Sequence, residues 1–361
     1  MHYISRLLKS IFLIFILATT SATVCSAAEA LTVDTISARS AIVLDPRNDR
    51  ILYGINPNIK HPPASTTKII TAMVVIDRLD PDAVVVISRN AASTASVAPH
   101  LVAGSKLTVR DLLYITLMRS VNGAAVALAE AAAGSEAEFA KLMNEKALEI
   151  GADNTVYVNA SGLPGTGQYT TAYDLARIMK ASLDYPLIRE IINTRTKHVE
   201  TESGRSMFLK NTNELLWSDE DLLGGKTGYT RAARHCFVGA AAKDGNMLIT
   251  VVLGESVREN LWHDTTALMD RGQSVLNNTA EPVINITSSD DERFIKKTTY
   301  RSNVKKNKAS VKSRSPKSKK GAAAASRTKV RKNRSTQSIK VDGTNKDDAF
   351  SDRMNKTEKG S

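Results

Sequence analysis

The order of strand-like and helix-like runs constrains the fold of this chain more than any other feature of its sequence. In the region before residue 287, strand-like runs lie near the N-terminal end and again near the C-terminal end, and helix-like runs lie between them. Such an order favours one sheet that is assembled from both ends of the folded region. We therefore expect an α+β fold in which an antiparallel sheet of N-terminal and C-terminal strands is covered by helices.

Two hairpins define the predicted sheet. Ser40 to Leu44 and Arg50 to Ile55 are short apolar runs separated by Pro, Asn and Asp residues, which are typical of a tight turn. Cys236 to Ala242 and Met247 to Leu253 are joined through Asp244-Gly245, a pair that favours a two-residue hairpin turn. Shorter strands are predicted at Val84 to Ile87 and in a hairpin from Lys197 to Lys210.

The predicted helices begin at residue pairs typical of helix N-termini. In each pair a Ser or Thr precedes an acidic residue by three positions, so that its hydroxyl can accept a hydrogen bond from a free backbone N–H. The pairs are Thr108 with Asp111, Ser135 with Glu138 and Thr171 with Asp174. They open helices to Met118, about Ile150 and about Ala181, and further helices are expected from Ala124 to Ala133 and from Glu259 to about Leu276.

The N-terminal residues resemble an export signal. Basic residues precede an apolar core from Ile11 to Ala18, and small residues follow up to Ala28. We expect residues 1–28 to be a signal peptide and residues 29–286 to form one domain outside the cytoplasm, in the periplasm or cell envelope. The alternative is a retained membrane anchor, because Ile11 to Ala28 approaches the length that spans a bilayer.

The last 75 residues carry the excess positive charge of the chain. Residues 287–361 contain 22 Lys and Arg against 8 Asp and Glu, whereas the rest of the chain has 27 against 29. A segment so rich in charge and poor in apolar residues is expected to be disordered. We expect it to bind an anionic envelope polymer or lipid headgroups, with a solvated spacer as the alternative. Export argues against nucleic acid as a partner.

The sequence predicts neither a disulfide nor a metal or other cofactor. Signal cleavage would leave Cys236 as the single cysteine, and one cysteine cannot form an internal disulfide. No Cys and His residues have the spacing of a metal site. The fold must therefore depend on its apolar core.

Ser65 and Lys68 form the first candidate for chemistry. Residues three apart lie on one face of a helix, and the residues after Lys68 are apolar on every side, so the predicted helix is buried. A desolvated lysine has a lowered pKa, and its neutral amine can take the proton of the serine, which then attacks a carbonyl carbon. The alternative is an ordinary solvated pair.

Two further polar motifs follow Ser65-Thr66-Thr67-Lys68 in order: Ser120-Val121-Asn122 in a turn between helices, and Lys226-Thr227-Gly228 on a strand. This ordered trio resembles the active-site signature of the penicillin-recognising serine enzymes. From about Ile36 to Leu276 the chain is most similar to D-alanyl-D-alanine carboxypeptidases of the low-molecular-mass penicillin-binding protein family. Members of this family usually carry a β-rich second domain and a C-terminal amphipathic anchor, and neither is evident in this sequence, where the basic segment stands in their place.

The resemblance implies a role for each motif residue. Ser65 would be the acylated nucleophile, Lys68 its general base and Ser120 a proton relay to the leaving amine. The backbone amides of Ser65 and Tyr229 would form the oxyanion hole. Substrate-binding roles are implied for Asn122, Lys226, Thr227, Gly228 and Tyr229, with Lys226 and Thr227 engaging a terminal carboxylate and Gly228 leaving room for an added substrate strand.

Some residues depart from the family pattern or allow two interpretations. Val121 is bulkier than the residue usual at its position, and Gly123 stands where an acidic residue is common. Arg258 either assists carboxylate binding or is a solvated arginine. We expect structural roles for the other candidates, namely His235, Cys236, Trp217 and Trp262.

The resemblance implies removal of the terminal D-alanine from peptidoglycan stem peptides, with β-lactams as covalent inhibitors. The alternatives are a D,D-endopeptidase on the same scaffold, a β-lactamase and a non-catalytic wall-binding factor. The acidic loop by which class A β-lactamases deliver water is not evident in the sequence, which favours slow release of a penicilloyl group.

Overall fold

The computed structural model describes residues 36–286, which contain every predicted motif residue. The predicted signal peptide at 1–28, the first residues of the predicted domain and the basic segment at 287–361 lie outside the described residues. Within the described part, no helix combines the length and the apolar character needed to cross a membrane.

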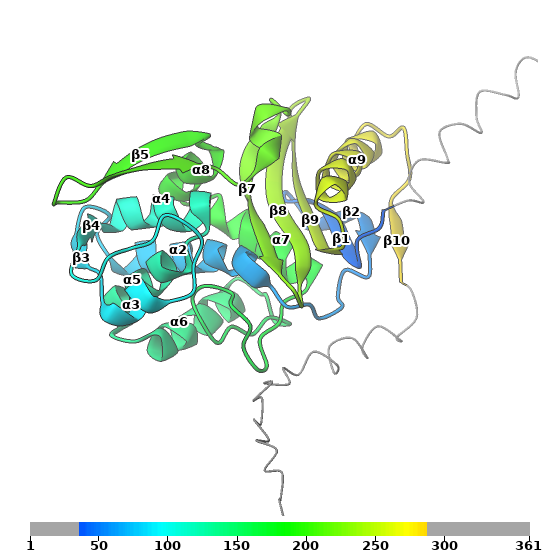
Figure 1. The fold of residues 1–361 in the computed structure, drawn as a ribbon. Helices are drawn as coiled ribbons and strands as arrows, with labels where there is room; N and C mark the ends of the chain where they lie inside the picture. The colour runs from blue at the N-terminus through cyan, green and yellow to red at the C-terminus, as the bar shows by residue number, and fades with distance from the viewer. Residues whose placement is uncertain (1–35, 287–361) are drawn as a thin grey trace, which may run out of the picture. The chain divides into compact units, whose positions relative to one another are not determined.

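A six-stranded sheet forms one half of the described domain (Figure 1). Its strand order is β10-β2-β1-β9-β8-β7, so N-terminal and C-terminal strands are neighbours, as the sequence predicts. All neighbours are antiparallel except β10, which pairs in parallel with β2 and was not predicted. The strands are β1 (Ser40–Asp45), β2 (Arg50–Ile55), β7 (Leu222–Thr230), β8 (Arg234–Lys243), β9 (Asn246–Glu255) and β10 (Val283–Asn285).

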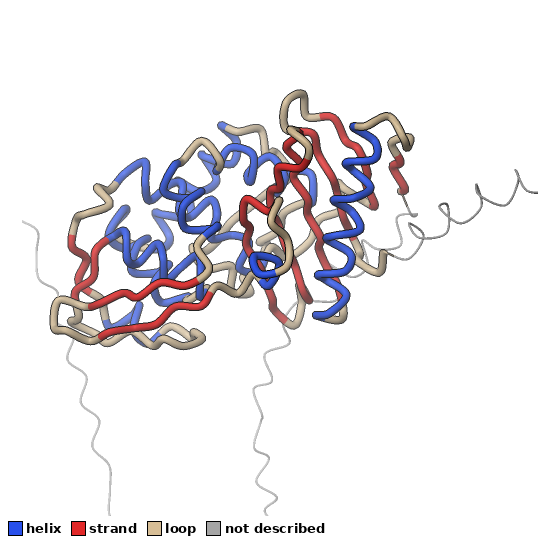
Figure 2. Tube along the Cα trace, turned by 90° about the horizontal axis from the view of Figure 1, so that it is seen from above, coloured by secondary structure: helices blue, strands red, loops and turns tan. Residues whose placement is uncertain are grey.

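The alternation of side chains along the strands divides the core between the two faces of the sheet. In β1, Ile42 and Leu44 join the large cluster that includes the helices α2 to α8, whereas Ala41 and Val43 join a smaller cluster under α9 (Arg258–Leu276). Figure 2 shows α9 lying along one face of the sheet. Both faces are therefore covered, and the predicted α+β fold is confirmed.

Helices and two small hairpins form the other half. The helical segments are η1 (Ala64–Thr67), α2 (Lys68–Arg78), α3 (Arg89–Ser93), α4 (Val109–Arg119), α5 (Asn122–Ala133), α6 (Glu136–Glu149), α7 (Ala172–Ser182), α8 (Pro186–Asn193) and η2 (Glu214–Trp217). The hairpins pair β3 (Val84–Val86) with β4 (Lys106–Thr108) and β5 (Thr196–Glu200) with β6 (Ser206–Lys210). The sequence did not predict α3, α8 or β4.

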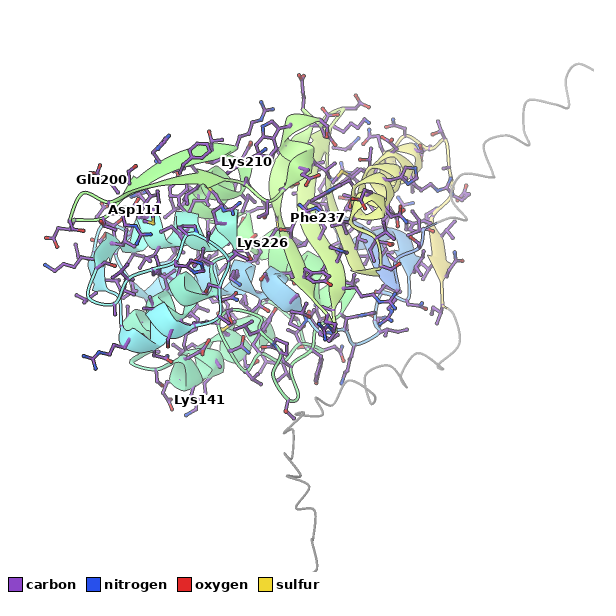
Figure 3. The ribbon with its side chains drawn as sticks, in the orientation of Figure 1. Asp111, Lys141, Glu200, Lys210, Lys226 and Phe237 are labelled. Carbon is purple, nitrogen blue, oxygen red and sulfur yellow. The ribbon has the colours of Figure 1, made fainter. Side chains whose placement is uncertain are left out.

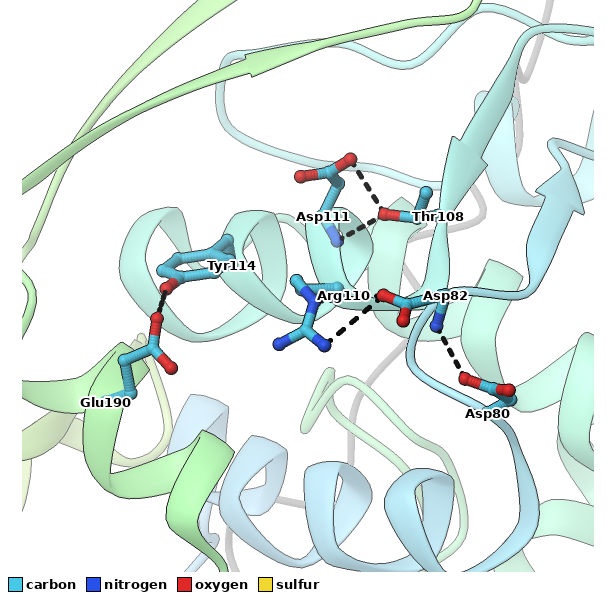
Figure 4. Close-up of polar contacts among 7 residues, drawn as sticks. All are labelled: Asp80, Asp82, Thr108, Arg110, Asp111, Tyr114 and Glu190. Carbon is cyan, nitrogen blue, oxygen red and sulfur yellow. Dashed lines mark hydrogen bonds and ion pairs between the residues drawn. The ribbon is translucent and has the colours of Figure 1, made fainter.

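The capping prediction for α4 is confirmed, and it fixes the helix that ends at Ser120. Asp111 donates its backbone N–H to Thr108 Oγ1 at 3.0 Å, and the Thr108 hydroxyl donates to Asp111 Oδ2 at 2.7 Å (Figure 4). The middle of the same helix is tied to α8 by a hydrogen bond from the Tyr114 hydroxyl to Glu190. With both ties in place, the C-terminal end of α4 lies beside the sheet edge at β7.

Candidate active site

Ser65 lies in a 3₁₀ turn and not, as the sequence analysis expected, in the first turn of an α-helix. The turn η1 spans Ala64–Thr67, and α2 begins at Lys68. The two side chains still meet, because Lys68 Nζ lies 3.0 Å from Ser65 Oγ. The 3₁₀ turn eclipses residues that are three apart, which brings this pair together more directly than an α-helix would.

Three oxygen atoms surround the Lys68 ammonium nitrogen. Besides Ser65 Oγ, it lies 2.7 Å from Asn122 Oδ1 and 2.5 Å from the backbone carbonyl oxygen of Ser161. Its side chain is fully buried, and this burial lowers the pKa of Lys68 well below the ordinary value of a lysine. The nearby Lys226 lowers the pKa further, whereas Glu136 opposes the shift.

This environment suits a neutral amine. A neutral lysine has two N–H groups and one lone pair, and the carbonyl oxygens of Asn122 and Ser161 can only accept hydrogen bonds. The two N–H groups can therefore be directed to these carbonyls, which leaves the lone pair for the Ser65 hydroxyl. In this geometry Lys68 can accept a proton from the Ser65 hydroxyl.

Ser120 projects from the opposite side of the site in a strained backbone conformation. It caps α4 with φ of 61°, in the left-handed region that residues with a Cβ rarely adopt. The Lys226 ammonium donates to Ser120 Oγ at 3.1 Å and to the Thr227 carbonyl at 2.8 Å. The second and third motifs are therefore joined directly, although 106 residues separate them.

Lys226 is buried on β7, between the sheet and the helices (Figure 3). Burial lowers its pKa to about 7. Its neighbour Thr227 is partly exposed, and Thr227 Oγ1 lies 2.7 Å from Thr212 Oγ1. A lysine that is charged below about pH 7, beside two hydroxyl groups, has the chemistry to bind a carboxylate.

Two glycines allow the chain to close around the nucleophile turn. A Cβ on Gly162 would lie 1.7 Å from the carbonyl oxygen of Ala64, and Gly162 also has φ of 78°. A Cβ on Gly228 would lie 3.1 Å from the backbone nitrogen of Ser65. The Ser161-Gly162 loop and strand β7 therefore hold the Ser65 turn from two sides, and side chains at these positions would displace it.

Gly123 has a structural explanation. A Cβ there would lie 2.4 Å from the carbonyl oxygen of Ala91 in α3, so an acidic side chain does not fit this backbone. Val121 is buried, and it joins the large core cluster. Asn122 Oδ1 faces Lys68, and its Nδ2 donates to the Ala95 carbonyl at 2.7 Å. One N–H of this amide is therefore already used within the chain.

Six of the predicted residues, Ser65, Ser120, Asn122, Thr227, Gly228 and Tyr229, line a cleft of about 270 Å³, whereas Lys68 and Lys226 are buried and are not part of its lining. Its lining residues are Ser65, Val97, Arg119, Ser120, Asn122, Thr212, Thr227, Gly228, Tyr229, His235, Arg258, Leu261 and Trp262. The Tyr229 side chain is exposed, and its ring lies 4.5 Å from the ring of His235. Among these described residues none is Asp or Glu.

The remaining candidates occupy structural positions or the rim. Cys236 is fully buried, and burial raises the pKa of its thiol to about 12. Trp262 packs edge-on against Phe237, as expected, but Trp217 is 43% exposed beneath the Lys210 ammonium. Arg258 reaches the cleft and pairs with Glu214 at 2.7 Å.

Sequence reasoning missed two residues of the site. Ser161 supplies a backbone carbonyl to Lys68, and Thr212 places its hydroxyl beside Thr227. The sequence, rich in Asn, Gly and Pro from Asn154 to Gln168, predicts an ordered loop here, but a backbone carbonyl leaves no trace in residue type, so its contact with Lys68 could not be predicted. Within residues 36–286, no three His, Cys, Asp or Glu side chains gather as they would around a metal ion.

Comparisons with known proteins agree on the family and on the fold. The family model described as D-alanyl-D-alanine carboxypeptidase matches residues 25–257. The D-alanyl-D-alanine carboxypeptidase DacF of Bacillus subtilis is 36% identical over 64% of this chain and 61% of its own length. The D-alanyl-D-alanine endopeptidase of Pseudomonas aeruginosa is 35% identical over 64% of this chain and 76% of its own length.

A solved structure agrees. A penicillin-binding protein homolog from Mycobacterium tuberculosis superposes with a TM-score of 0.64 at 35% identity, covering 69% of this chain and 95% of its own. The match to the family model, over residues 25–257, by itself spans more than half of the chain. This chain belongs to the D-alanyl-D-alanine carboxypeptidase family of serine-type hydrolases.

Proposed function

We propose that this protein is exported and removes the terminal D-alanine from peptidoglycan stem peptides through an acyl-enzyme on Ser65. One observation carries the proposal: the fully buried Lys68 amine lies 3.0 Å from Ser65 Oγ and its pKa is strongly lowered. A neutral base beside a serine is what acyl transfer requires.

The reaction follows from these positions. Lys68 takes the proton of Ser65, and Ser65 Oγ attacks the carbonyl carbon of the penultimate residue. The backbone amides of Ser65 and Tyr229 stabilise the oxyanion; such a donor typically contributes about 3 to 4 kcal/mol. The C–N bond then breaks, the leaving amine receives a proton through Ser120, and water later hydrolyses the ester.

Substrate orientation is set by the sheet side of the cleft. Lys226 and Thr227 bind the terminal carboxylate, while the substrate backbone lies along β7 beside Gly228 and contacts the free N–H of Asn122. The cleft lining, within the described residues, holds no carboxylate to activate water. Penicillin is therefore expected to acylate Ser65 and to leave slowly, which argues against a β-lactamase.

Covalent labelling with a fluorescent penicillin tests the acyl-enzyme. The wild-type protein should be labelled and Ser65→Ala should not, whereas Ser93→Ala, at an exposed serine, should be labelled like wild type. Labelling that persists in Ser65→Ala, or its absence in wild type, would overturn the proposal. Absence of labelling in a folded wild type would instead favour a non-catalytic wall-binding protein.

A D,D-endopeptidase is the second candidate, because the Pseudomonas relative carries that name. Both activities use the same acylation and differ in the leaving group. Product analysis on a monomeric pentapeptide and on cross-linked muropeptides separates them: release of free D-alanine supports the first, and release of two stem peptides supports the second.

The basic segment at 287–361 is proposed to hold the enzyme at the envelope through anionic polymer or lipid headgroups. Removing this segment should reduce sedimentation with cell envelopes at low salt and should have little effect at high salt, where charges are screened. Unchanged sedimentation at both salt concentrations would leave the segment as a solvated spacer.

A further inference from the structure

We propose that Glu136 is a positioning residue for the base of this site: through the Ala160 backbone it holds the Ser161 carbonyl against the Lys68 amine, and it places a negative charge near that amine. The inference rests on the proposed function and deepens it, because it gives a role to a side chain outside the three motifs. Glu136 is half-buried in the first turn of α6, and it does not line the cleft.

The loop that supplies the Ser161 carbonyl is tied to two helices at the residue just before it. Ala160 donates its N–H to Glu136 Oε1 at 2.9 Å, and its carbonyl accepts from the Thr71 hydroxyl at 2.8 Å. Glu136 belongs to α6 and Thr71 to α2. With both polar groups of Ala160 fixed, the next carbonyl, that of Ser161, is directed at Lys68 Nζ, 2.5 Å away.

The other side of the turn is closed within the loop itself. The Asn159 side chain accepts the N–H of Gly162 at 2.8 Å and donates to the carbonyl of Leu163 at 2.8 Å. These bonds set the shape of the turn but do not attach it to a helix. Its placement beside Lys68 therefore depends on Glu136 and Thr71, which hold it from the outside.

Two charged side chains act on Lys68, and their effects are opposite. Burial is the largest cause of the lowered pKa of Lys68, and the Lys226 cation on β7 lowers the pKa further, whereas the Glu136 carboxylate raises it. A base is most effective when its pKa lies near the working pH. Glu136 thus offsets part of the loss of basicity that burial and Lys226 impose on the amine.

The charged side chains on the other helices that pack against α2 have partners elsewhere. The carboxylates on α4, α5, α7 and α8 accept hydrogen bonds from hydroxyl or amide groups: Asp111 from Thr108, Glu130 from Asn90, Asp174 from Thr155 and Glu190 from Tyr114. The cations donate to carboxylates or carbonyls: Arg110 to Asp82, Arg119 to Ala98 and Lys210, Arg177 to Gly151, Lys180 to Asp49 and Arg189 to Leu183. The charges that bear on Lys68 are those of Glu136 and Lys226.

Glu136→Gln separates the charge from the hydrogen bond, because the amide oxygen of glutamine can still accept the Ala160 N–H. The measurement is the rate of acylation by a fluorescent penicillin as a function of pH. The acidic limb of this profile should move to lower pH by about half a unit or more, because a nearby negative charge no longer favours the ammonium form. The plateau rate should fall about two- to tenfold, since a weaker base takes the Ser65 proton less readily.

Glu136→Ala removes the hydrogen bond as well. Its plateau rate should fall about threefold or more below that of Glu136→Gln, and the Ala160 amide should exchange with solvent faster than in wild type. The matched control is Glu138→Gln, two residues along in the same turn of α6, where the exposed carboxylate is paired with Lys141 at 2.7 Å. The control should keep the wild-type limb, plateau and exchange rate.

Each part of the proposal can fail separately. A wild-type limb in Glu136→Gln would overturn the role of the charge. Equal plateau rates in the Gln and Ala variants would overturn the hold on the loop, and if the Ala variant does not fold, fast exchange of the Ala160 amide in folded wild type would overturn it too. Lys226→Gln should move the limb to higher pH, and movement to lower pH would also contradict the proposal. Absence of penicillin labelling in wild type would overturn the proposed function instead.

Discussion

The cleft lies between a helical wall, formed by η1, α2 and α5, and a sheet wall, formed by β7. Each wall buries one lysine, Lys68 on the helical side and Lys226 on the sheet side, but the two lysines have different surroundings. The helical wall surrounds Lys68 with a serine hydroxyl and two carbonyl oxygens. The sheet wall gives Lys226 one hydroxyl and one carbonyl, from Ser120 and Thr227, and these two residues line the open cleft. The pKa of Lys68 falls well below the ordinary value, and that of Lys226 falls to about 7.

Under the proposed function, this difference lets one residue type serve two purposes. Lys68 must be neutral to act as a base, and its position behind Ser65 keeps it away from water and anions. Lys226 can regain its proton when a carboxylate arrives, because the incoming charge favours the ammonium form. Since the two sites are electrostatically coupled, a charged Lys226 also helps to keep Lys68 neutral.

Lys68→Arg should have the largest effect on activity, because it removes the proposed base from the helical wall. Arginine keeps its charge at every accessible pH, so it cannot take the Ser65 proton. We expect acylation by penicillin to slow by about 1,000-fold or more, in line with the loss of a general base. Stopped-flow labelling measures the rate, and a variant within tenfold of wild type would show that Lys68 is not the base.

Gly162→Ala should displace the turn that carries Ser65, because the added methyl group has no room there. The added methyl group collides with the Ala64 carbonyl, so we expect a loss of about 2 to 4 kcal/mol in unfolding free energy together with slow acylation. Gly104→Ala is the matched control, since Gly104 also has positive φ, at 82°, but nothing within 4 Å of an added Cβ.

The control should lose only the backbone cost, about 1 kcal/mol. Urea unfolding gives the free energies, and penicillin labelling gives the acylation rate. If the two alanine variants were equally stable and equally reactive, the Gly162 contact with the nucleophile turn would have no importance for the site.

Lys226→Ala tests the sheet wall. It should lower kcat/KM by about 100-fold for a peptide with a free terminal carboxylate, as expected when a charged hydrogen bond is lost. The same peptide with an amidated C-terminus should lose much less. Steady-state hydrolysis of the two peptides measures the difference, and equal losses would contradict the carboxylate role.

The pH dependence of wild type separates the two lysines. Lys226 is an ammonium below its pKa of about 7 and neutral above it, so kcat/KM for the carboxylate peptide should decline as pH rises through about 7. Lys68 must lose its proton, so acylation should decline as pH falls through its lowered pKa. The amidated peptide should keep only the acidic limb, and an alkaline decline in both peptides would point to another group.

The sequence predicted the elements that depend on local patterns. The capping pair at Thr108 and Asp111 and the Asp244-Gly245 turn are confirmed because their side chains and backbone act within a few residues. The parallel partner β10 and the helices α3 and α8 were missed, since short segments take their structure from the surfaces they pack against.

The candidate site likewise has features that the sequence predicts and features that only the folded structure shows. The three motifs mark Ser65, Lys68, Ser120 and Lys226, because the proposed chemistry depends on their side chains. The Ser161 carbonyl and the positive φ of Ser120 have no counterpart in residue type, and they arise only when the loop and the turn are folded against α2 and β7. Tertiary contacts therefore determine the pKa of Lys68, while the sequence only indicates which residue it is.

Arg258→Gln is expected to have the smallest effect, and it tests whether the sheet wall uses a second cation. Arg258 lines the cleft, but its guanidinium is paired with Glu214 at 2.7 Å on an exposed surface. Exposed pairs contribute about 0 to 1 kcal/mol, so stability should hardly change, and kcat/KM for the carboxylate peptide should fall by less than about twofold.

Glu214→Gln is the companion variant, because it frees the arginine without removing it. If Arg258 can reach the substrate carboxylate once released, that variant should bind the peptide more tightly than wild type. A loss in Arg258→Gln as large as in Lys226→Ala would instead mean that the arginine leaves Glu214 during turnover, and that the two walls differ less than their resting contacts indicate.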